Sequence, residues 1–374
     1  MSFFADILSS LFDRKLGLAN RVEDDNKPID DLCQALLSSR GDVSGMSLAQ
    51  LILDRYADLD DDDKLAWFSL LANDMDVPAE VAIAAIKAYQ DAPSAKNYEA
   101  MTAAVEPARL QLIRRLNQTH DATAKLVAMR EDLIRFLPEH TDLGKLNVDF
   151  KHLFASWFNR GFLVLRPINW SSPAHILEKI ITYESVHEIE NWDDLRRRLQ
   201  PEDRRCFAFF HPAMPDEPLI FVEVALTKGT PNSIQSVLLE NRDAMAAENA
   251  DTAAFYSISN CQAGLAGISF GNSLIKTVVQ HLLRELPQIR NFVTLSPIPG
   301  LVKWLRETGN FDADATAETH LRLAAHYLLN AKHHRGQPHD PVARFHLNNG
   351  ALVGAVHANA DKSKNGMAQS CGVM

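Results

Sequence analysis

Cysteine is scarce in this sequence, and its spacing excludes several classes of site. The 374 residues contain four cysteines, Cys33, Cys206, Cys261 and Cys371, and no two of them form a Cys-x-x-Cys pair. Such spacing offers neither a disulfide framework nor a cysteine-based zinc site. It is typical of a reduced intracellular compartment, so we expect a cytoplasmic protein. Cys261 is predicted to be a small buried thiol, with a nucleophile as the alternative.

Positive charge and long apolar runs are lacking as well. Lys and Arg number 38 against 48 Asp and Glu, which gives a formal net charge of −10. This balance argues against a nucleic-acid binder and against an anionic membrane surface, but it allows a local basic pocket for an anionic ligand. No apolar run approaches the ~20 residues of a membrane span. The apolar N-terminus contains Asp6 and has no basic leader, so we expect no secretory signal.

The first 160 residues have few strand signals. Apolar residues recur at helical spacing through residues 28–137, which predicts an all-helical domain of five to eight helices, packed as an antiparallel bundle. The acidic run 58–63 is interpreted as an N-cap and first turn for a helix over 64–73, with a cation site as the alternative. We expect residues 1–160 to form this helical domain, which serves as scaffold or oligomerisation surface.

Short β-rich runs appear after residue 160 and alternate with helical patterns. They predict a second domain over residues 161–374 and, for the whole chain, an α+β fold. The proline-rich turn 212–218 separates two strand candidates and predicts a hairpin. Expected strands are residues 186–189, 206–210 and 219–226, expected helices are 143–158, 173–184 and 192–199, and residues 351–358 are strand-like.

A glycine-containing turn lies at the centre of this second domain. A strand over 253–258 is followed by Gly264, Gly267 and Gly271, then by a helix that Pro287 ends and a second strand over 291–296. Unpaired backbone N–H groups at such a turn suit an anion, phosphate above all, although glycine there can also serve only a tight backbone. The spacing is neither Gly-x-Gly-x-x-Gly nor a P-loop, so neither a dinucleotide site nor a nucleotide triphosphate site is predicted.

Ser296 lies at the end of a predicted strand, before Pro297, and His346 is one of 14 histidines. Taken alone, a serine before proline is most often a cap. A serine-hydrolase role is disfavoured, because no Gly-x-Ser-x-Gly surrounds Ser296 and Pro297 lacks the N–H that helps to build an oxyanion hole. A zinc site is the alternative for His333, His334, His339 and His346, but their spacing fits no standard site and residues 333–336 are typical of a solvated helix end.

Several stretches of the second domain match one known family, in order and over most of residues 140–374. The matching stretches are Trp170–Ala174, Leu177–Ile181, Arg204–Pro212, Pro215–Leu219, Glu223–Thr227, Phe255–Ser259, Leu295–Gly300, Asp340–Ala343 and Phe345–Gly350. Through these stretches the chain resembles the malonyl-CoA decarboxylases. The resemblance implies a catalytic domain with the acetyltransferase-like (GNAT) mixed α/β fold behind a helical domain, and conversion of malonyl-CoA to acetyl-CoA and carbon dioxide. The acetyltransferase phosphate turn is matched at Gly264 and Ala266 but not at Cys261.

The same resemblance implies the site residues. It assigns Ser296 as hydrogen-bond partner or proton acceptor and His346, with a pKa near neutrality, as the proton donor to the thioester enolate, which backbone N–H groups stabilise. Members of the family carry Glu where this chain has Ser269, and they continue into an Asn-Tyr-x-Tyr element after the last residues seen here. The substrate-binding residues implied are Ala266, Gly267, Ile268, Ser269, Phe270, Gly271 and Asn272, together with Ser296 and His346.

Cofactors and partners follow from the resemblance too. We expect malonyl-CoA and acetyl-CoA as ligands, no cofactor and no metal, and no nucleic acid or membrane partner. A homo-oligomer, dimer or tetramer, is expected through the helical domain. Two alternatives stay open: an acyl-CoA N-acyltransferase, which would need an acceptor amine, and a non-catalytic CoA-binding or scaffold protein, which Ser269 would explain.

Overall fold

The chain forms two compact units. The computed structural model describes residues 27–39, 42–268, 270, 274–333 and 336–374, and the side chains of 42 and 43 are left aside. One unit is Met1–Ser156 with Ala263–Ile268, and the other is Trp157–Gln262 with Ser269–Met374. Within the described ranges, no helix has both the length and the apolar character that crossing a membrane requires.

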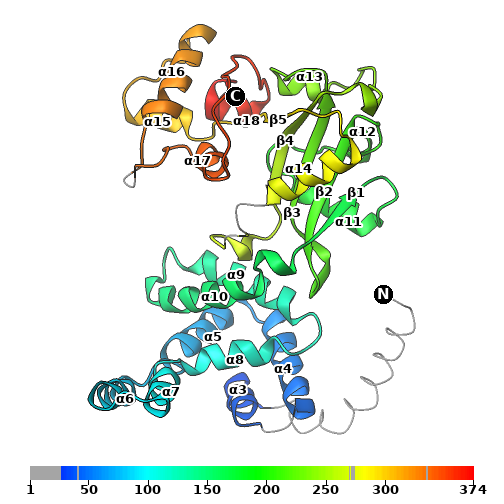
Figure 1. Ribbon diagram of the computed structural model, residues 1–374. Coiled ribbons are helices and arrows are strands. Elements are labelled where there is room, and N and C mark those ends of the chain that lie inside the picture. The colour runs from blue at the N-terminus through cyan, green and yellow to red at the C-terminus, as the bar shows by residue number, and fades with distance from the viewer. Residues whose placement is uncertain (1–26, 40–41, 269, 271–273, 334–335) are drawn as a thin grey trace. The chain divides into compact units, whose positions relative to one another are not determined.

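The first unit is helical, as the apolar periodicity predicts (Figure 1). Its core includes residues of the predicted apolar faces, among them Ile113, Leu126 and Leu133, which are fully buried. Asp60 caps α5 by accepting from the backbone N–H of Asp63 at 2.9 Å, so the N-cap interpretation of the acidic run is confirmed. The helices are α3 Ile29–Ser38, α4 Asp42–Ala57, α5 Asp61–Asn73, α6 Ala79–Asp91, α7 Ala95–Ala104, α8 Ala108–Leu116, α9 Ala122–Phe136, η1 Thr141–Leu143 and α10 Gly144–Trp157.

The second unit is built on a mixed five-stranded sheet in the order β1-β2-β3-β4-β5. The first four strands pair antiparallel, and β4 pairs with β5 in parallel. The predicted hairpin is confirmed as β2 and β3, although β3 already begins at Met214 inside the proline-rich turn. The strands are β1 Val164–Ile168, β2 Arg204–His211, β3 Met214–Thr227, β4 Thr252–Asn260 and β5 Asn291–Thr294.

Helices cover both faces of this sheet (Figure 1). Helix α14, Leu274–Glu285, packs through Leu274, Val278 and Leu282 on one face, with Phe207 and Phe209 of β2. Helices α11, Ala174–Tyr183, and α12, Trp192–Leu199, pack on the other face with the alternate residues of β2. Because side chains alternate along a strand, an apolar run such as 206–210 supplies both cores at once.

Four short helices complete the second unit. The first two of them share a core that includes Leu301, Leu305, Ala324 and Tyr327, all fully buried. The four helices are α15 Leu301–Glu307, α16 Ala317–Asn330, α17 Pro341–Asn348 and α18 Lys364–Ser370. The remaining short elements are η2 Arg160–Phe162, α13 Ile234–Leu238, η3 Ala247–Asn249 and, in the first unit, η4 Ala263–Leu265.

Two predicted strands are wrong. Residues 186–189 form no strand, because side chains bind their backbone: Glu184 accepts the N–H groups of Val186 and His187, and Arg198 donates to the carbonyls of residues 187 and 188. Residues 351–358 likewise join no sheet. There His357 exchanges two backbone hydrogen bonds with Met374 instead. The periodicity of a sequence cannot predict a buried charged side chain that binds the backbone, nor a pairing with the last residue of the chain.

Candidate functional site

Ser296 and His346, separated by 50 residues, meet in the second unit. Ser296 Oγ lies 3.1 Å from His346 Nε2, a hydrogen bond whose donor depends on the imidazole tautomer. Both residues are half-buried. The structure therefore places the predicted pair within hydrogen-bond reach, the first geometric requirement for a nucleophile–base or acid–acceptor pair.

The end of β5 sets the position of Ser296. Strand β5 runs beside β4 only as far as the Phe255–Thr294 pair, and the last bond across is from the N–H of Leu295 to the carbonyl of Phe255. Pro297 and Pro299 have no N–H with which to continue the ladder, so the chain leaves the sheet at Ser296. Ser296 thus stands at the carboxyl edge of a parallel strand pair, a usual location for ligand sites in sheets with parallel strands.

Asp340 fixes His346 relative to Ser296. Its Oδ1 accepts the backbone N–H groups of Val342 and Ala343, both at 2.9 Å, and so caps α17, the helix that carries His346. Its Oδ2 accepts the N–H of Gly300 at 3.2 Å, in the loop that follows Ser296. One carboxylate that is 1% exposed thus joins both halves of the pair. Sequence reasoning missed this role, although an Asp before Pro at a helix start is a recognisable N-cap signal.

Burial controls the charge of His346. Desolvation lowers the pKa of this imidazole from its ordinary 6.5 to about 4, because burial takes hydration from the cationic form. His346 is therefore neutral at pH 7 in the free protein. This differs from the near-neutral pKa expected from the sequence, and it means that a proton donor at this position has to be charged by what binds there.

The predicted substrate segment is only partly within the described residues. Ser269, Gly271 and Asn272 lie outside them, whereas Phe270 packs against the α14 side of the sheet core. Ala266 and Gly267 are exposed and Ile268 is buried. These three residues belong to Ala263–Ile268, which clusters with the helical unit and not with the sheet.

Arg130 of α9 holds that segment on the helical unit. Its guanidinium donates to the carbonyls of Gly264 and Ala266, at 2.5 and 2.8 Å, and to Asn147 Oδ1 at 3.0 Å, while the side chain is 1% exposed. Gly264 packs directly on α9, since a Cβ there would lie 1.9 Å from the carbonyl oxygen of Val127. The helical half therefore does more than scaffold: it fixes the glycine turn. A contact across 134 residues leaves no local signal in the sequence.

Cysteine and metal chemistry find little support in the described residues. Cys261 is buried, and desolvation raises its pKa well above the ordinary range, so the thiol predicted as buried is buried and protonated. All four cysteines are free. Within the part of the chain that the structure describes, no three His, Cys, Asp or Glu side chains gather as metal ligands; His334, one of the four histidines considered for zinc, lies outside that part.

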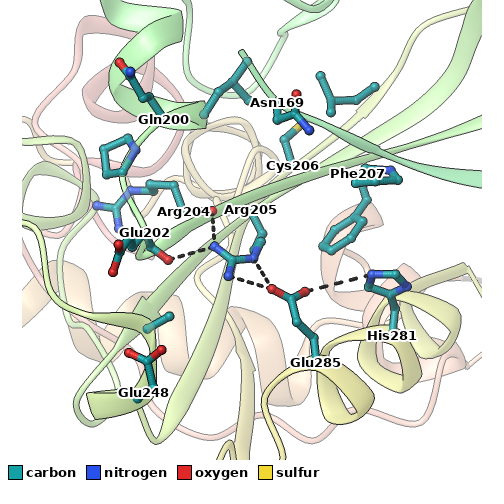
Figure 2. Close-up of a pocket in the computed structure, with 15 residues that line it drawn as sticks. Asn169, Gln200, Glu202, Arg204, Arg205, Cys206, Phe207, Glu248, His281 and Glu285 are labelled. Carbon is teal, nitrogen blue, oxygen red and sulfur yellow. Dashed lines mark hydrogen bonds and ion pairs between the residues drawn. The ribbon is translucent and has the colours of Figure 1, made fainter. Parts of the chain in front are cut away.

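A separate hollow of about 470 Å³ lies in the second unit, away from the pair. Figure 2 shows Arg205 bonded to Glu285, at 2.7 and 2.9 Å, with His281 on the other side of that carboxylate. Neither Ser296 nor His346 lines it. Because Arg205 is already neutralised and two further carboxylates, Glu202 and Glu248, line the same hollow, it offers no net positive field for an anionic ligand.

Comparisons with known proteins cover both units. Residues 77–158 match the family model described as malonyl-CoA decarboxylase N-terminal domain, and residues 161–319 and 308–374 match the malonyl-CoA decarboxylase C-terminal domain. Two solved structures, malonyl-CoA decarboxylases from Rhodopseudomonas palustris and Agrobacterium vitis, are 50% and 47% identical, each with a TM-score of 0.86. Both comparisons cover 92% of this chain and 91% of the other.

Curated relatives agree with these matches. The mitochondrial malonyl-CoA decarboxylase of Anser anser anser is 38% identical over 314 residues, which are 70% of this chain and 62% of the relative. That of Mus musculus is 34% identical over 322 residues, 72% of this chain and 65% of the relative. The chain thus spans slightly less than two thirds of the length of the curated relatives it matches.

Proposed function

Since the chain belongs to the malonyl-CoA decarboxylase family, we propose that it converts malonyl-CoA to acetyl-CoA and carbon dioxide. The observation that carries the proposal is the 3.1 Å contact between Ser296 and His346, two residues that the resemblance assigns to catalysis and that Asp340 holds together. Incubation of the full chain with malonyl-CoA and a metal chelator tests it. Acetyl-CoA is the expected product; free CoA would indicate hydrolysis or acyl transfer instead.

In the proposed reaction, Ser296 and His346 together deliver one proton to the substrate. The bond between C2 and the carboxylate breaks, its electrons pass to the thioester oxygen, carbon dioxide leaves, and the resulting enolate takes a proton at C2. We assign that proton to the imidazolium of His346, oriented by Ser296, and assign stabilisation of the enolate oxygen to backbone N–H groups. A single such donor contributes about 3 kcal/mol in other enzymes. The neutral imidazole then regains its proton from solvent.

The charge that His346 lacks in the free protein is supplied, in this account, by substrate binding. A carboxylate placed next to an imidazole favours the cation and raises its pKa by about 1–3 units. The pKa of His346, which is about 4 in the free protein, would therefore rise in the complex. At a pH between the pKa of His346 in the free protein and its pKa in the complex, the imidazole takes up a proton when the substrate binds. The kcat falls as pH rises through the pKa of the complex, because the imidazole then loses that proton.

Calorimetry of a non-reacting analogue tests this proton uptake. Binding of a malonyl-CoA thioether, measured near pH 6 in two buffers of different ionisation enthalpy, is expected to take up several tenths of a proton per site. Acetyl-CoA, which has no carboxylate, should take up almost none, and His346→Asn should abolish the uptake while the analogue still binds. Binding of the analogue by the wild type with no proton uptake would contradict the imidazolium role.

We also propose that the helical unit joins copies of this chain. The hairpin of α6 and α7 exposes most of its large apolar residues, with Val81, Ile83 and Tyr98 more than half exposed, and Ala82 is the one buried residue of α6. Several large apolar side chains exposed on one hairpin are typical of an interaction site. A dimer or tetramer built on it would cover these residues.

Charge on this surface should dissociate the oligomer. Ile83→Asp is expected to shift the mass measured by light scattering toward that of a single chain, because an unpaired carboxylate would be buried in the interface. Leu329→Asp on α16, whose leucine is similarly exposed, should leave the mass unchanged. A wild type that runs as a monomer, or equal effects of both variants, would contradict the assignment to α6 and α7.

The proposal also covers cofactors and location. Turnover is proposed to need no metal or other cofactor, since the pair and backbone donors can serve the single proton and the single developing charge. The chelator in the assay above tests this. A cytoplasmic location also stays a prediction, which fluorescence microscopy of the tagged chain in its own host would check.

A further inference from the structure

Lys151 of α10 lies beside the glycine turn. Most basic side chains on α8–α10 are occupied: Arg109 binds Asp76 and Asp149, and Lys145 binds Asp76. Lys151 is exposed and, among the described residues, its ammonium makes no hydrogen bond or ion pair. An ammonium with no partner in the described part of the chain is available to bind an anion.

The position of Lys151 is set by the fold of the helical unit. Gly267 has a left-handed φ of +75°, and a Cβ built on it would lie 3.5 Å from both Cε and Nζ of Lys151. The ammonium therefore lies against the backbone of the turn. Arg130 anchors the same turn through the carbonyls of Gly264 and Ala266, which precede Gly267. Helix and turn belong to one compact unit, so their spacing does not depend on the second unit.

We propose that Lys151 binds a phosphate group of the CoA part of the substrate, so that the helical unit takes a direct part in substrate recognition. The inference rests on the proposed function for the identity of the ligand. CoA thioesters carry a pyrophosphate and a 3′-phosphate, whereas the chain has a net charge of −10, which repels such a ligand unless local cations offset it. Lysine binds phosphate as a point charge.

Two substrates distinguish a contact between Lys151 and phosphate from a general effect of Lys151 on the site. Malonyl-pantetheine has the same reacting thioester as malonyl-CoA but none of the nucleotide phosphates. For Lys151→Gln, the KM for malonyl-CoA is expected to rise about five- to tenfold with kcat within about twofold, a loss that added salt should mimic in the wild type. The kcat/KM for malonyl-pantetheine should not change, and Lys151→Arg should retain most of the wild-type KM.

Lys145→Gln is the matched control. It lies on the same helix with a similar exposure, but its charge is already used by Asp76, so the KM for malonyl-CoA should stay at the wild-type value. An unchanged KM in Lys151→Gln would overturn the proposal. An equal rise with both substrates would also overturn it, because the residue would then act on the turn and not on phosphate.

Binding of CoA itself keeps this test independent of turnover. Calorimetry with CoA should show weaker binding by Lys151→Gln than by the wild type even if neither releases carbon dioxide, in which case the proposed activity fails and the phosphate contact stands. If Lys151→Gln and the wild type bind CoA equally well and the wild type is active, the phosphate contact fails and the proposed activity stands.

Discussion

His346→Ala is expected to lower kcat for malonyl-CoA by at least about a hundredfold, the lower end of the effect of a general acid. The side chain is half-buried and its imidazole is the group within 3.1 Å of Ser296 Oγ. Alanine removes both the proton donor and the partner of the serine. Binding of malonyl-CoA should survive, since the CoA part of the ligand is untouched. Initial rates of acetyl-CoA formation, normalised to folded protein, measure the effect.

Two further variants show what the loss means. Ser296→Ala should also reduce kcat, by less than His346→Ala if the serine only orients the imidazole. His320→Ala is the control, because His320 is 8% exposed, bonds to the carbonyl of Asp312 and should cost stability without changing kcat. A His346→Ala enzyme that retains more than about a tenth of the wild-type kcat would contradict the assignment of the proton.

Asp340→Ala is expected to lower kcat by about a hundredfold with KM within about threefold, although Asp340 need not touch the substrate. Its carboxylate caps the helix of His346 and binds the N–H of Gly300, so alanine frees both sides of the pair at once. Misplacement of a catalytic group by about 1 Å costs a factor of that size. Asp340→Asn can keep the cap through its carbonyl oxygen but not the bond to Gly300, and should lie between.

If Asp340 only stabilised the fold, Asp340→Ala would behave like the loss of another buried carboxylate. Asp361→Ala removes a carboxylate that is 2% exposed and bonds Ser363 N, at a helix that carries no catalytic residue; it should lower the melting temperature and leave kcat unchanged. The pKa of His346, followed by NMR, should rise from about 4 toward 6.5 in Asp340→Ala as water enters, and stay low in Asp361→Ala. Identical behaviour of the two variants would contradict the positioning role.

Local patterns carried most of the fold. Apolar periodicity predicted the helices of the first unit and α14, and the two runs around residues 212–218 predicted the β2–β3 hairpin, because the period of a helix face and the residues of a turn are local features of the sequence. Residues 186–189 show where local patterns fail. Their apolar and β-branched composition favours a strand, but Glu184 and Arg198 form hydrogen bonds with the backbone groups that a strand would need.

The candidate site divides in the same way. Ser296 and His346 were predicted through a resemblance, and the structure brings them into contact without itself testing their roles. Arg130 could not be predicted, because it bonds backbone carbonyls more than 130 residues away and carbonyls have no sequence signature. The low pKa of His346 was equally hidden, since it depends on what the folded chain packs around the imidazole.

The most direct test of the central claim is the initial rate of acetyl-CoA and carbon dioxide formation from malonyl-CoA, with chelator and without any acceptor, for the wild type beside Ser296→Ala and His346→Ala. The account predicts equal amounts of the two products from the wild type and a rate at least about a hundredfold lower in His346→Ala. A wild-type chain that binds malonyl-CoA but releases no carbon dioxide would contradict it.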